Sequence, residues 1–270
     1  MALRRTPPCI LLIAGSDSSG GAGIQADLRT AGAFGLHAVS VVTAVTAQDR
    51  RGVTAIHPIP RTTLLAQLEA ARDIPVRAVK IGMLGRPAAV TTVAEYLSTL
   101  GASNIVLDPV LAASSGKALL TPTALRRLRD TLLPLADLLT PNLPEAEILL
   151  GRSLPSARAI RAATYDLVAL GARAVLLKGG HRRGKLVIDY LNDGNAIHEF
   201  AHERLPWKTR GTGCTLATAA ASALAYGMAV VDAVDRAERF VQHALRAAAV
   251  VDASGQRLMS PLMPIGNVSR

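Results

Sequence analysis

Residues Ile10 to Gly23 read Ile-Leu-Leu-Ile-Ala-Gly-Ser-Asp-Ser-Ser-Gly-Gly-Ala-Gly. The stretch opens with an unbroken aliphatic run, which is typical of a β-strand buried on both faces of a parallel sheet. A loop rich in glycine and serine follows, and a helical pattern begins at Gly23. The order of strand, loop and helix is the first half of a βαβ unit, so it favours an α/β fold.

The same alternation of short aliphatic runs and helical stretches continues along the chain. Gly35, Gly101 and Gly171 each stand just after a predicted helix and just before a predicted strand, where a left-handed glycine closes a helix. The predicted strands are Ile10–Ala14, Val39–Val45, Val79–Ile81, Ile105–Leu107, Leu138–Thr140 and Val175–Lys178, and the predicted helices are Gly23–Phe34, Thr63–Arg72, Ala88–Leu100, Pro122–Leu133, Pro144–Leu150 and Ala157–Leu170.

The last third of the sequence departs from this pattern. Leu186–Leu191 and Ala196–Phe200 flank a turn at Asn192-Asp193-Gly194, which predicts a small antiparallel hairpin near 186–200. Helices are predicted over Gly213–Tyr226 and Val231–Val250, and the tail from Ser254 is expected to be poorly ordered. We therefore predict a three-layer α/β/α sandwich with a mostly parallel central sheet, in one domain spanning residues 1–270.

Composition excludes several classes of protein. Half of the 270 residues are hydrophobic and 19% are charged, which is incompatible with a disordered chain, and no apolar run reaches the roughly 18 residues of a membrane helix. Only Cys9 and Cys214 are cysteines, and they form no CxxC pair, so we expect a reduced, cytoplasmic location. The net charge of +10 comes mostly from scattered arginines, and aromatic residues make up 3%, so no nucleic-acid partner is expected.

The loop Gly15–Gly23 is predicted to bind a ligand. Glycine lets backbone N–H groups approach a bound molecule closely, because it has no Cβ. The loop is neither a Walker A loop nor a GxGxxG loop, since its sequence is Gly-Ser-Asp-Ser-Ser-Gly-Gly-Ala-Gly. The alternative interpretation is a tight turn between strand and helix, although Asp17 and so many glycines and serines exceed what one turn requires.

A second glycine-containing loop, Gly211-Thr212-Gly213-Cys214, opens an alanine-rich helix. The free N–H groups at a helix N-terminus form a site for an anion, and the helix dipole adds positive potential. Cys214 falls in the first turn, where the pKa of a thiol is expected to be lowered, so that its thiolate could act as a general base. The spacing alone equally allows a small buried cysteine.

Further polar residues stand at the ends of predicted strands. Asn142 and Glu145 could hold a hydrated Mg²⁺, or they could form a capping box at the start of a helix. Asp108 and Lys178 follow two other strands, at the edge where open α/β sheets bind ligands, and we expect them to line a nucleotide and phosphate site. Gln48 offers an amide donor and acceptor suited to a heteroaromatic amino group.

The segment His198-Glu-Phe-Ala-His202 matches the zinc-protease pattern HExxH, but we reject a zinc protease. That chemistry needs both histidines on one face of a helix, whereas this segment follows a turn and is predicted to be a strand. In a strand the two histidines would lie about 13 Å apart, too far for one ion.

Taken together, the motifs resemble the ribokinase-like superfamily and, within it, the hydroxymethylpyrimidine/phosphomethylpyrimidine kinases of thiamine biosynthesis. The resemblance extends from about Cys9 to about Val250. It rests on Ala14-Gly-Ser-Asp-Ser-Ser-Gly-Gly-Ala-Gly-Ile-Gln-Ala-Asp27, Lys80-Ile-Gly-Met-Leu84, Thr140-Pro-Asn-Leu-Pro-Glu-Ala146, Lys178-Gly-Gly-His181 and Gly211-Thr-Gly-Cys-Thr215.

The resemblance implies transfer of the γ-phosphoryl group of ATP, with Mg²⁺, to the 5-hydroxymethyl group of 4-amino-5-hydroxymethyl-2-methylpyrimidine. A second transfer to the monophosphate would give the diphosphate. By position, Gln48 would bind the pyrimidine amino group, while Ala22, Met83 and Val110 would surround the ring. The resemblance also implies a homodimer.

The resemblance likewise assigns the groups that handle phosphate. Gly211, Thr212, Gly213 and the Cys214 amide would form the anion hole, and the Cys214 side chain stands where many superfamily members have an aspartate base. Lys178 would face the nucleotide. Asn142 and Glu145 would organise Mg²⁺ through water.

The sequence departs from the family at three places, one of which is the tail, which lacks the family's usual Gly-His-Gly-Pro ending. Arg210 stands where the family commonly has His, and Ala113-Ser-Ser-Gly-Lys117 replaces a usual Ala-Lys-Ser-Gly-Asp. The alternatives to the main interpretation are a pyridoxal kinase of the same subfamily, and a non-catalytic pyrimidine-binding protein that kept the fold.

Overall fold

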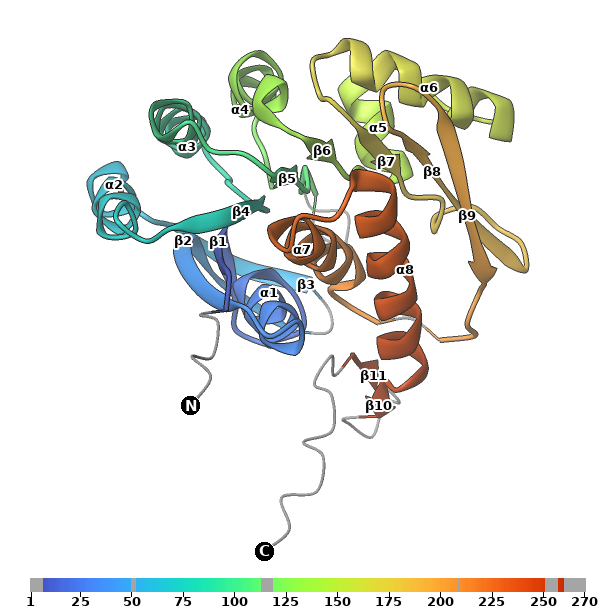
Figure 1. Cartoon of the computed structure of the whole chain (residues 1–270), viewed down its shortest axis with the longest axis horizontal. Coiled ribbons are helices and arrows are strands. Elements are labelled where there is room, and N and C mark those ends of the chain that lie inside the picture. Colours follow the sequence, from blue (N-terminus) through green and yellow to red (C-terminus); the bar gives the residue numbers. More distant parts are fainter. Residues whose placement is uncertain (1–6, 50–51, 113–118, 208, 251–256, 260–270) are drawn as a thin grey trace, which may run out of the picture.

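A computed structural model describes residues 7–49, 52–112, 119–207, 209–250 and 257–259. Its main feature is a nine-stranded sheet in the order β3-β2-β1-β4-β5-β6-β7-β8-β9 (Figure 1). The strands are β1 (Cys9–Asp17), β2 (His37–Asp49), β3 (Gly52–Pro58), β4 (Val76–Ile81), β5 (Ile105–Leu107), β6 (Leu138–Leu139), β7 (Val175–Leu177), β8 (Leu186–Asn192) and β9 (Ile197–Glu203). A separate short pair joins β10 (Ala249–Val250) to β11 (Arg257–Leu258).

The central strands β2, β1, β4, β5, β6 and β7 are parallel, whereas β3, β8 and β9 run antiparallel to their neighbours. This confirms the predicted mostly parallel sheet and its hairpin near 186–200. The hairpin connection lies one residue later than predicted, because Asn192 still pairs with Ile197 across it.

Helices cover both faces of the sheet, as the predicted sandwich requires (Figure 1). The helices are α1 (Gly23–Ala33), α2 (Arg61–Ala70), α3 (Pro87–Leu100), α4 (Pro122–Arg127), η1 (Leu128–Leu132), η2 (Leu133–Leu135), α5 (Leu143–Leu150), α6 (Ala157–Ala169), α7 (Thr212–Ala225) and α8 (Val230–Arg246). Among the described residues, none of these helices combines the length and the apolar character that crossing a membrane requires.

The strand sequences explain the two layers of core. Leu11 and Ile13 of β1 pack in the cluster that includes α2 to α6, whereas Ile10 and Leu12 pack in the cluster that includes α1, α7 and α8. All four side chains are at most 1% exposed. An unbroken aliphatic run is therefore what a strand with a helix layer on each face needs.

Two predicted helix ends were wrong, and one strand was missed. The helix predicted over Val231–Val250 ends at Arg246, and Ala249–Val250 form β10 instead. The helix predicted over Pro122–Leu133 is α-helical only to Arg127 and continues as a π turn and a 3₁₀ turn; Pro134, which has no N–H for an α-helical hydrogen bond, lies in the 3₁₀ turn. Strand β3 was not predicted, because this partly exposed edge strand lacks the aliphatic run of the others.

Candidate active site

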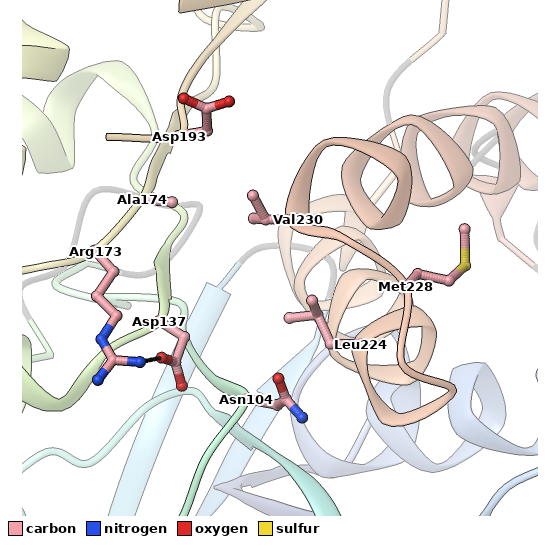
Figure 2. Close-up of a pocket in the computed structure, with 8 residues that line it drawn as sticks. All are labelled: Asn104, Asp137, Arg173, Ala174, Asp193, Leu224, Met228 and Val230. Atoms are coloured by element: carbon pink, nitrogen blue, oxygen red, sulfur yellow. Dashed lines mark hydrogen bonds and ion pairs between the residues drawn. The ribbon is translucent and has the colours of Figure 1, made fainter. Parts of the chain in front are cut away.

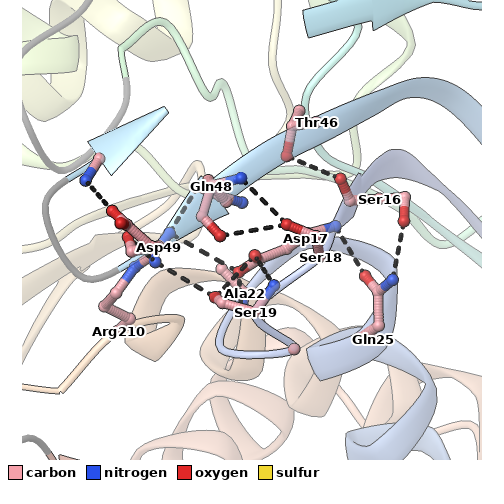
Figure 3. A network of polar contacts seen from close by, with 12 residues as sticks. Ser16, Asp17, Ser18, Ser19, Ala22, Gln25, Thr46, Gln48, Asp49 and Arg210 are labelled. Atoms are coloured by element: carbon pink, nitrogen blue, oxygen red, sulfur yellow. Dashed lines mark hydrogen bonds and ion pairs between the residues drawn. The ribbon is translucent and has the colours of Figure 1, made fainter. Parts of the chain in front are cut away.

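The loop after β1 is folded by its own aspartate. Asp17 is buried; its Oδ1 accepts hydrogen bonds from the Ser19 N–H at 2.8 Å and the Ser19 hydroxyl at 2.7 Å, and its Oδ2 accepts from the Ala22 N–H at 2.8 Å (Figure 3). Gln25 of α1 holds the other side of the loop, since its Oε1 accepts from the Asp17 N–H. Asp17 therefore shapes the loop in this structure.

The second glycine loop packs directly against the first. Gly211 has a positive φ of 78°, and a Cβ built on it would lie 2.1 Å from the Gly21 carbonyl oxygen. No other residue type fits both the backbone angle and this contact. The loop at the start of α7 and the loop after β1 therefore form one surface, although nearly 200 residues separate them.

The start of α7 faces a lysine and an aspartate. A Cβ built on Gly213 would lie 3.1 Å from Lys178 Nζ and 3.7 Å from Asp108 Oδ2. Lys178 Nζ donates to Asp108 Oδ1 at 3.0 Å, and both side chains are largely buried. The N–H groups of the first helical turn, the helix dipole and the ammonium group together favour an anion at this point.

Asn142 and Glu145 form the capping box that was one of two interpretations of their spacing. Asn142 Oδ1 accepts from the Glu145 N–H at 2.9 Å, and Glu145 Oε2 accepts from the Asn142 N–H at 2.8 Å. Burial raises the pKa of Glu145 to about 7, against the lowering effect of Lys178. The cap places the Glu145 carboxyl near Asp108 and Lys178, and the charges of both residues act on its pKa.

Cys214 contradicts one expectation. Burial raises the pKa of its thiol to about 11, and this outweighs the lowering effects of the Lys80 charge and of the hydrogen bond from the Gly23 N–H. The prediction that the helix start lowers this pKa was wrong, because the cost of removing the thiolate from water exceeds the benefit of the dipole. At neutral pH the side chain is a neutral thiol.

Arg210 contacts the residue predicted to bind substrate. Its guanidinium donates to the Gln48 Oε1, and it also donates to the Asp49 carbonyl at 2.7 Å and the Ser19 hydroxyl at 3.2 Å (Figure 3). Its side chain is only 14% exposed, and it lies 3.6 Å from Asp17 Oδ2. Arg210 therefore ties the end of β2 and the loop after β1 to the anion site that begins at the next residue.

The remaining predicted substrate residues lie around these loops. Ala22 is beside Gly211, whose built Cβ would lie 3.2 Å from the Ala22 Cα, and Met83 is beside Gly15, whose built Cβ would lie 3.2 Å from the sulfur. Val110 directly follows the Asp108 strand end, and its N–H donates to the Asp108 carbonyl at 2.8 Å. The departure at Ala113–Lys117 lies outside the described residues.

A buried ion pair beneath the site was not predicted. Lys80 Nζ donates to both oxygens of Asp27, at 2.9 and 2.7 Å, and both side chains are completely buried. The Thr218 hydroxyl of α7 donates to the same carboxylate at 2.8 Å. The pair joins α1, β4 and α7, so it holds together the elements that carry the two glycine loops. Both residues fall in the quoted motifs, but sequence alone does not show that they meet.

A separate pocket of about 280 Å³ lies at the amino ends of strands β5, β6 and β7, opposite the carboxyl ends where the two glycine loops meet (Figure 2). It is lined by Asn104, Asp137, Arg173, Ala174, Asp193, Leu224, Met228 and Val230, and none of the predicted site residues is among them. Arg173 donates to Asp137 at 2.9 Å within it. The residues predicted to carry the chemistry therefore lie outside this pocket, at the carboxyl edge of the sheet, where the two glycine loops meet.

Comparisons with known proteins show the family of this chain. Residues 17–258 match the family model described as phosphomethylpyrimidine kinase. A hydroxymethylpyrimidine/phosphomethylpyrimidine kinase of Mycobacterium tuberculosis is 50% identical over 247 residues, which cover 90% of each chain.

Solved structures give the same fold. A phosphomethylpyrimidine kinase from Clostridium difficile matches with a TM-score of 0.79 at 39% identity, covering 88% of this chain and 99% of that one. An ADP complex of Bacillus subtilis pyridoxal kinase matches with a TM-score of 0.86 at 32% identity, covering 94% and 98%. The ribokinase-like fold is confirmed, and the chain belongs to the phosphomethylpyrimidine kinase family.

Proposed function

We propose that this enzyme transfers the γ-phosphoryl group of ATP to the hydroxymethyl group of 4-amino-5-hydroxymethyl-2-methylpyrimidine, and then a second one to the monophosphate, in thiamine biosynthesis. The observation that carries the proposal is the convergence at Gly213, where the first turn of α7, Lys178 and Asp108 meet beside the loop after β1. Phosphoryl transfer needs chiefly such positioning and charge stabilisation.

The residues of the proposed anion site have different roles in phosphoryl transfer. The amides of Thr212, Gly213 and Cys214 donate to the oxygens of the migrating phosphoryl group, and Lys178 neutralises the charge between the nucleotide and the acceptor. The thiolate form of Cys214 takes up the proton of the attacking hydroxyl and becomes a neutral thiol. A thiol with a pKa of about 11 is protonated in nearly every molecule at neutral pH, so this role predicts a rate that rises with pH.

The oxygen donors beside Lys178 fit a magnesium ion. Asp108, just after β5, and Glu145, in the first turn of α5, are buried carboxyl groups, and Mg²⁺ prefers one or two carboxylates together with water and substrate phosphates. The Asn142 side-chain oxygen already accepts the hydrogen bond of the helix cap. Asn142 would therefore contact the ion only indirectly, through Glu145 or a water molecule. When bound, Mg²⁺ would neutralise charge on the ATP phosphates.

Arg210 sets how Gln48 presents its amide to the pyrimidine. A guanidinium group only donates hydrogen bonds, so the Gln48 oxygen faces Arg210 and its NH₂ group faces elsewhere. The NH₂ group can then donate to a ring nitrogen, while the second lone pair of the oxygen accepts from the exocyclic amino group. Ala22, Met83 and Val110 would surround the ring.

The decisive experiment is a kinase assay that resolves the products. Purified chain receives Mg-ATP with either the pyrimidine alcohol or pyridoxal, and chromatography separates mono- from diphosphate. We expect both pyrimidine phosphates and a much larger kcat/KM for the pyrimidine than for pyridoxal. Gly211→Ala is the control, because its Cβ would collide with the Gly21 carbonyl at 2.1 Å.

Pyridoxal kinase is the second candidate, favoured by the TM-score of 0.86 with the Bacillus subtilis enzyme. A kcat/KM ratio that strongly favours pyridoxal would replace the proposed substrate. Absence of ADP release with either compound would instead indicate a non-catalytic pyrimidine-binding protein.

The proposed setting is cytoplasmic and the proposed assembly a homodimer. Cys9 and Cys214 are both free thiols, which suits a reducing compartment. Light scattering after size-exclusion chromatography measures the assembly, and a mass near 28.2 kDa would contradict the dimer.

A further inference from the structure

A cluster of three metal-binding side chains lies outside the proposed active site. Asp189 of β8, His202 of β9 and Glu238 of α8 each offer one ligand atom, and these atoms all lie within 4.8 Å of one another. Asp189 and Glu238 are 4% and 6% exposed. His202 is one of the two histidines of the HExxH match, and the other, His198, is engaged with Asp193 at 2.8 Å.

The strand register explains why His202 points to this place. Asp189 pairs with Phe200 across the hairpin, and His202 is two residues beyond Phe200 on the same strand. Side chains two apart on a strand share a face, so His202 and Asp189 are diagonal neighbours. Helix α8 packs against β9 on this face and adds Glu238, whose Oε2 lies 3.9 Å from His202 Nδ1.

The cluster contains buried oxygens that nothing in the described structure satisfies. Glu238 Oε1 and Gln242 Oε1 have no hydrogen-bond partner among the described residues, although both residues are at least nine-tenths buried. Gln242 follows Glu238 by one helical turn and therefore lies on the same side of α8. A buried polar atom without a partner costs about 1–3 kcal/mol, so such atoms point to a missing ligand.

The two carboxyl groups of the cluster act on each other. Burial and the neighbouring Asp189 carboxylate raise the pKa of Glu238 well above its usual range, and Lys178 only partly counteracts this. Burial lowers the pKa of His202, the Asp189 carboxylate raises it, and the charges of Arg204 and Arg246 lower it further. An imidazole nitrogen and two carboxyl groups whose ligand atoms all lie within 4.8 Å of one another form a donor set for a cation.

We infer that Asp189, His202 and Glu238 form a binding site for one divalent transition-metal ion, with the Gln242 oxygen or a water molecule as a further ligand. A mixed nitrogen and oxygen donor set suits Zn²⁺ or Co²⁺ better than Mg²⁺, which prefers oxygen and retains its waters. The site is therefore distinct in its chemistry from the magnesium fit at Asp108 and Glu145.

The proposed metal site lies next to the loop that begins at Lys178, the residue proposed to face the nucleotide. Asp189 Oδ1 accepts a hydrogen bond from the Gly179 N–H, the residue after Lys178. A Cβ on Gly179 would lie 2.0 Å from the Ile188 carbonyl oxygen, so this loop is pressed against β8. An ion on Asp189 would brace the backbone that carries Lys178, without itself taking part in phosphoryl transfer.

The test uses the full chain, stripped with a chelator and dialysed, without nucleotide and in excess Mg²⁺. Zn²⁺ is titrated by calorimetry, and Co²⁺ is added separately so that its visible absorption reports the coordination geometry. We expect one ion per chain, a raised melting temperature, and a Co²⁺ spectrum typical of nitrogen and oxygen ligands without sulfur. A thiolate-to-metal charge-transfer band would assign the ion to a cysteine and overturn the site.

Two variants locate the ion. Glu238→Gln keeps the side-chain shape and His202→Asn removes the nitrogen ligand, and each is expected to weaken Zn²⁺ binding at least about tenfold. His198→Asn is the matched control on the same strand and is expected to bind as the wild type does. The proposal fails if the wild type binds no ion, in which case the Asp189 and Glu238 carboxyls share a proton, or if His202→Asn binds as tightly as His198→Asn.

Discussion

Replacement of Lys80 by methionine tests the buried ion pair beneath the active site. Methionine has nearly the same length, so the change removes the charge and leaves the packing. Asp27, completely buried, would keep only the hydrogen bond from Thr218 at 2.8 Å. Burial lowers the pKa of Lys80, but Asp27 outweighs this and raises it, so the lysine is charged in the wild type.

Protonation of Asp27 sets an upper limit on the stability that Lys80→Met can lose. An isolated carboxylate in this interior takes up a proton, and holding a carboxyl of ordinary pKa about 3.9 in its neutral form at pH 7 costs about 4 kcal/mol. Breaking a buried pair typically costs about 3–5 kcal/mol, so the two estimates agree. We expect Lys80→Met to lower the free energy of unfolding by about 4 kcal/mol at pH 7.

The sign of the pH dependence follows from the same argument. In Lys80→Met the folded state holds one proton more than the unfolded state above pH 4, so stability relative to the wild type falls as the pH rises. The deficit of about 4 kcal/mol at pH 7 should shrink to about 1.5 kcal/mol at pH 5. Urea unfolding followed by circular dichroism measures both values.

The matched control is Lys80→Met combined with Asp27→Asn. Asparagine still accepts the Thr218 hydrogen bond but has no titratable group, so the deficit of the double variant should not vary between pH 5 and pH 7. A single-variant deficit below about 1 kcal/mol, or one equal at both pH values, would refute the argument that Lys80 is needed to keep Asp27 charged.

Three further changes probe the site itself. Cys214→Ser should lower kcat with little change in the KM for ATP, and the wild-type kcat should rise tenfold per pH unit between pH 7 and 10, because the thiol pKa is about 11; an unchanged kcat would remove the base role. Arg210→Met should raise the KM for the pyrimidine about tenfold, the cost of one charge-assisted hydrogen bond to Gln48, with the KM for ATP as the internal control. Glu145→Gln keeps the cap acceptor but removes a carboxyl whose pKa is raised to about 7; the wild type should therefore lose up to about 3 kcal/mol of stability as the pH rises from 4.5 to 7, and the variant should not, which unfolding at the two pH values measures.

The layered fold was predictable because its signal is local. An aliphatic run such as Ile10–Ala14 is explained only by burial on both faces, and a glycine such as Gly101, with φ of 61°, is readable as a helix end from its neighbours. The edge strand Gly52–Pro58 was missed because one of its sides faces no helix layer, so its composition carries no strong pattern.

The proposed anion site also has a local signal, since Gly211 and Gly213 stand together in a short motif at a helix start. Contacts between residues far apart in the sequence have no such signal. Lys80 meets Asp27, Arg210 meets Gln48, and His202 meets Glu238 only because the chain returns to the same sheet edge or face after long intervals. The pKa of Cys214 could not be predicted from the sequence for a similar reason. Position in a helix is a local property, whereas desolvation of the thiol depends on how much of the rest of the molecule surrounds it.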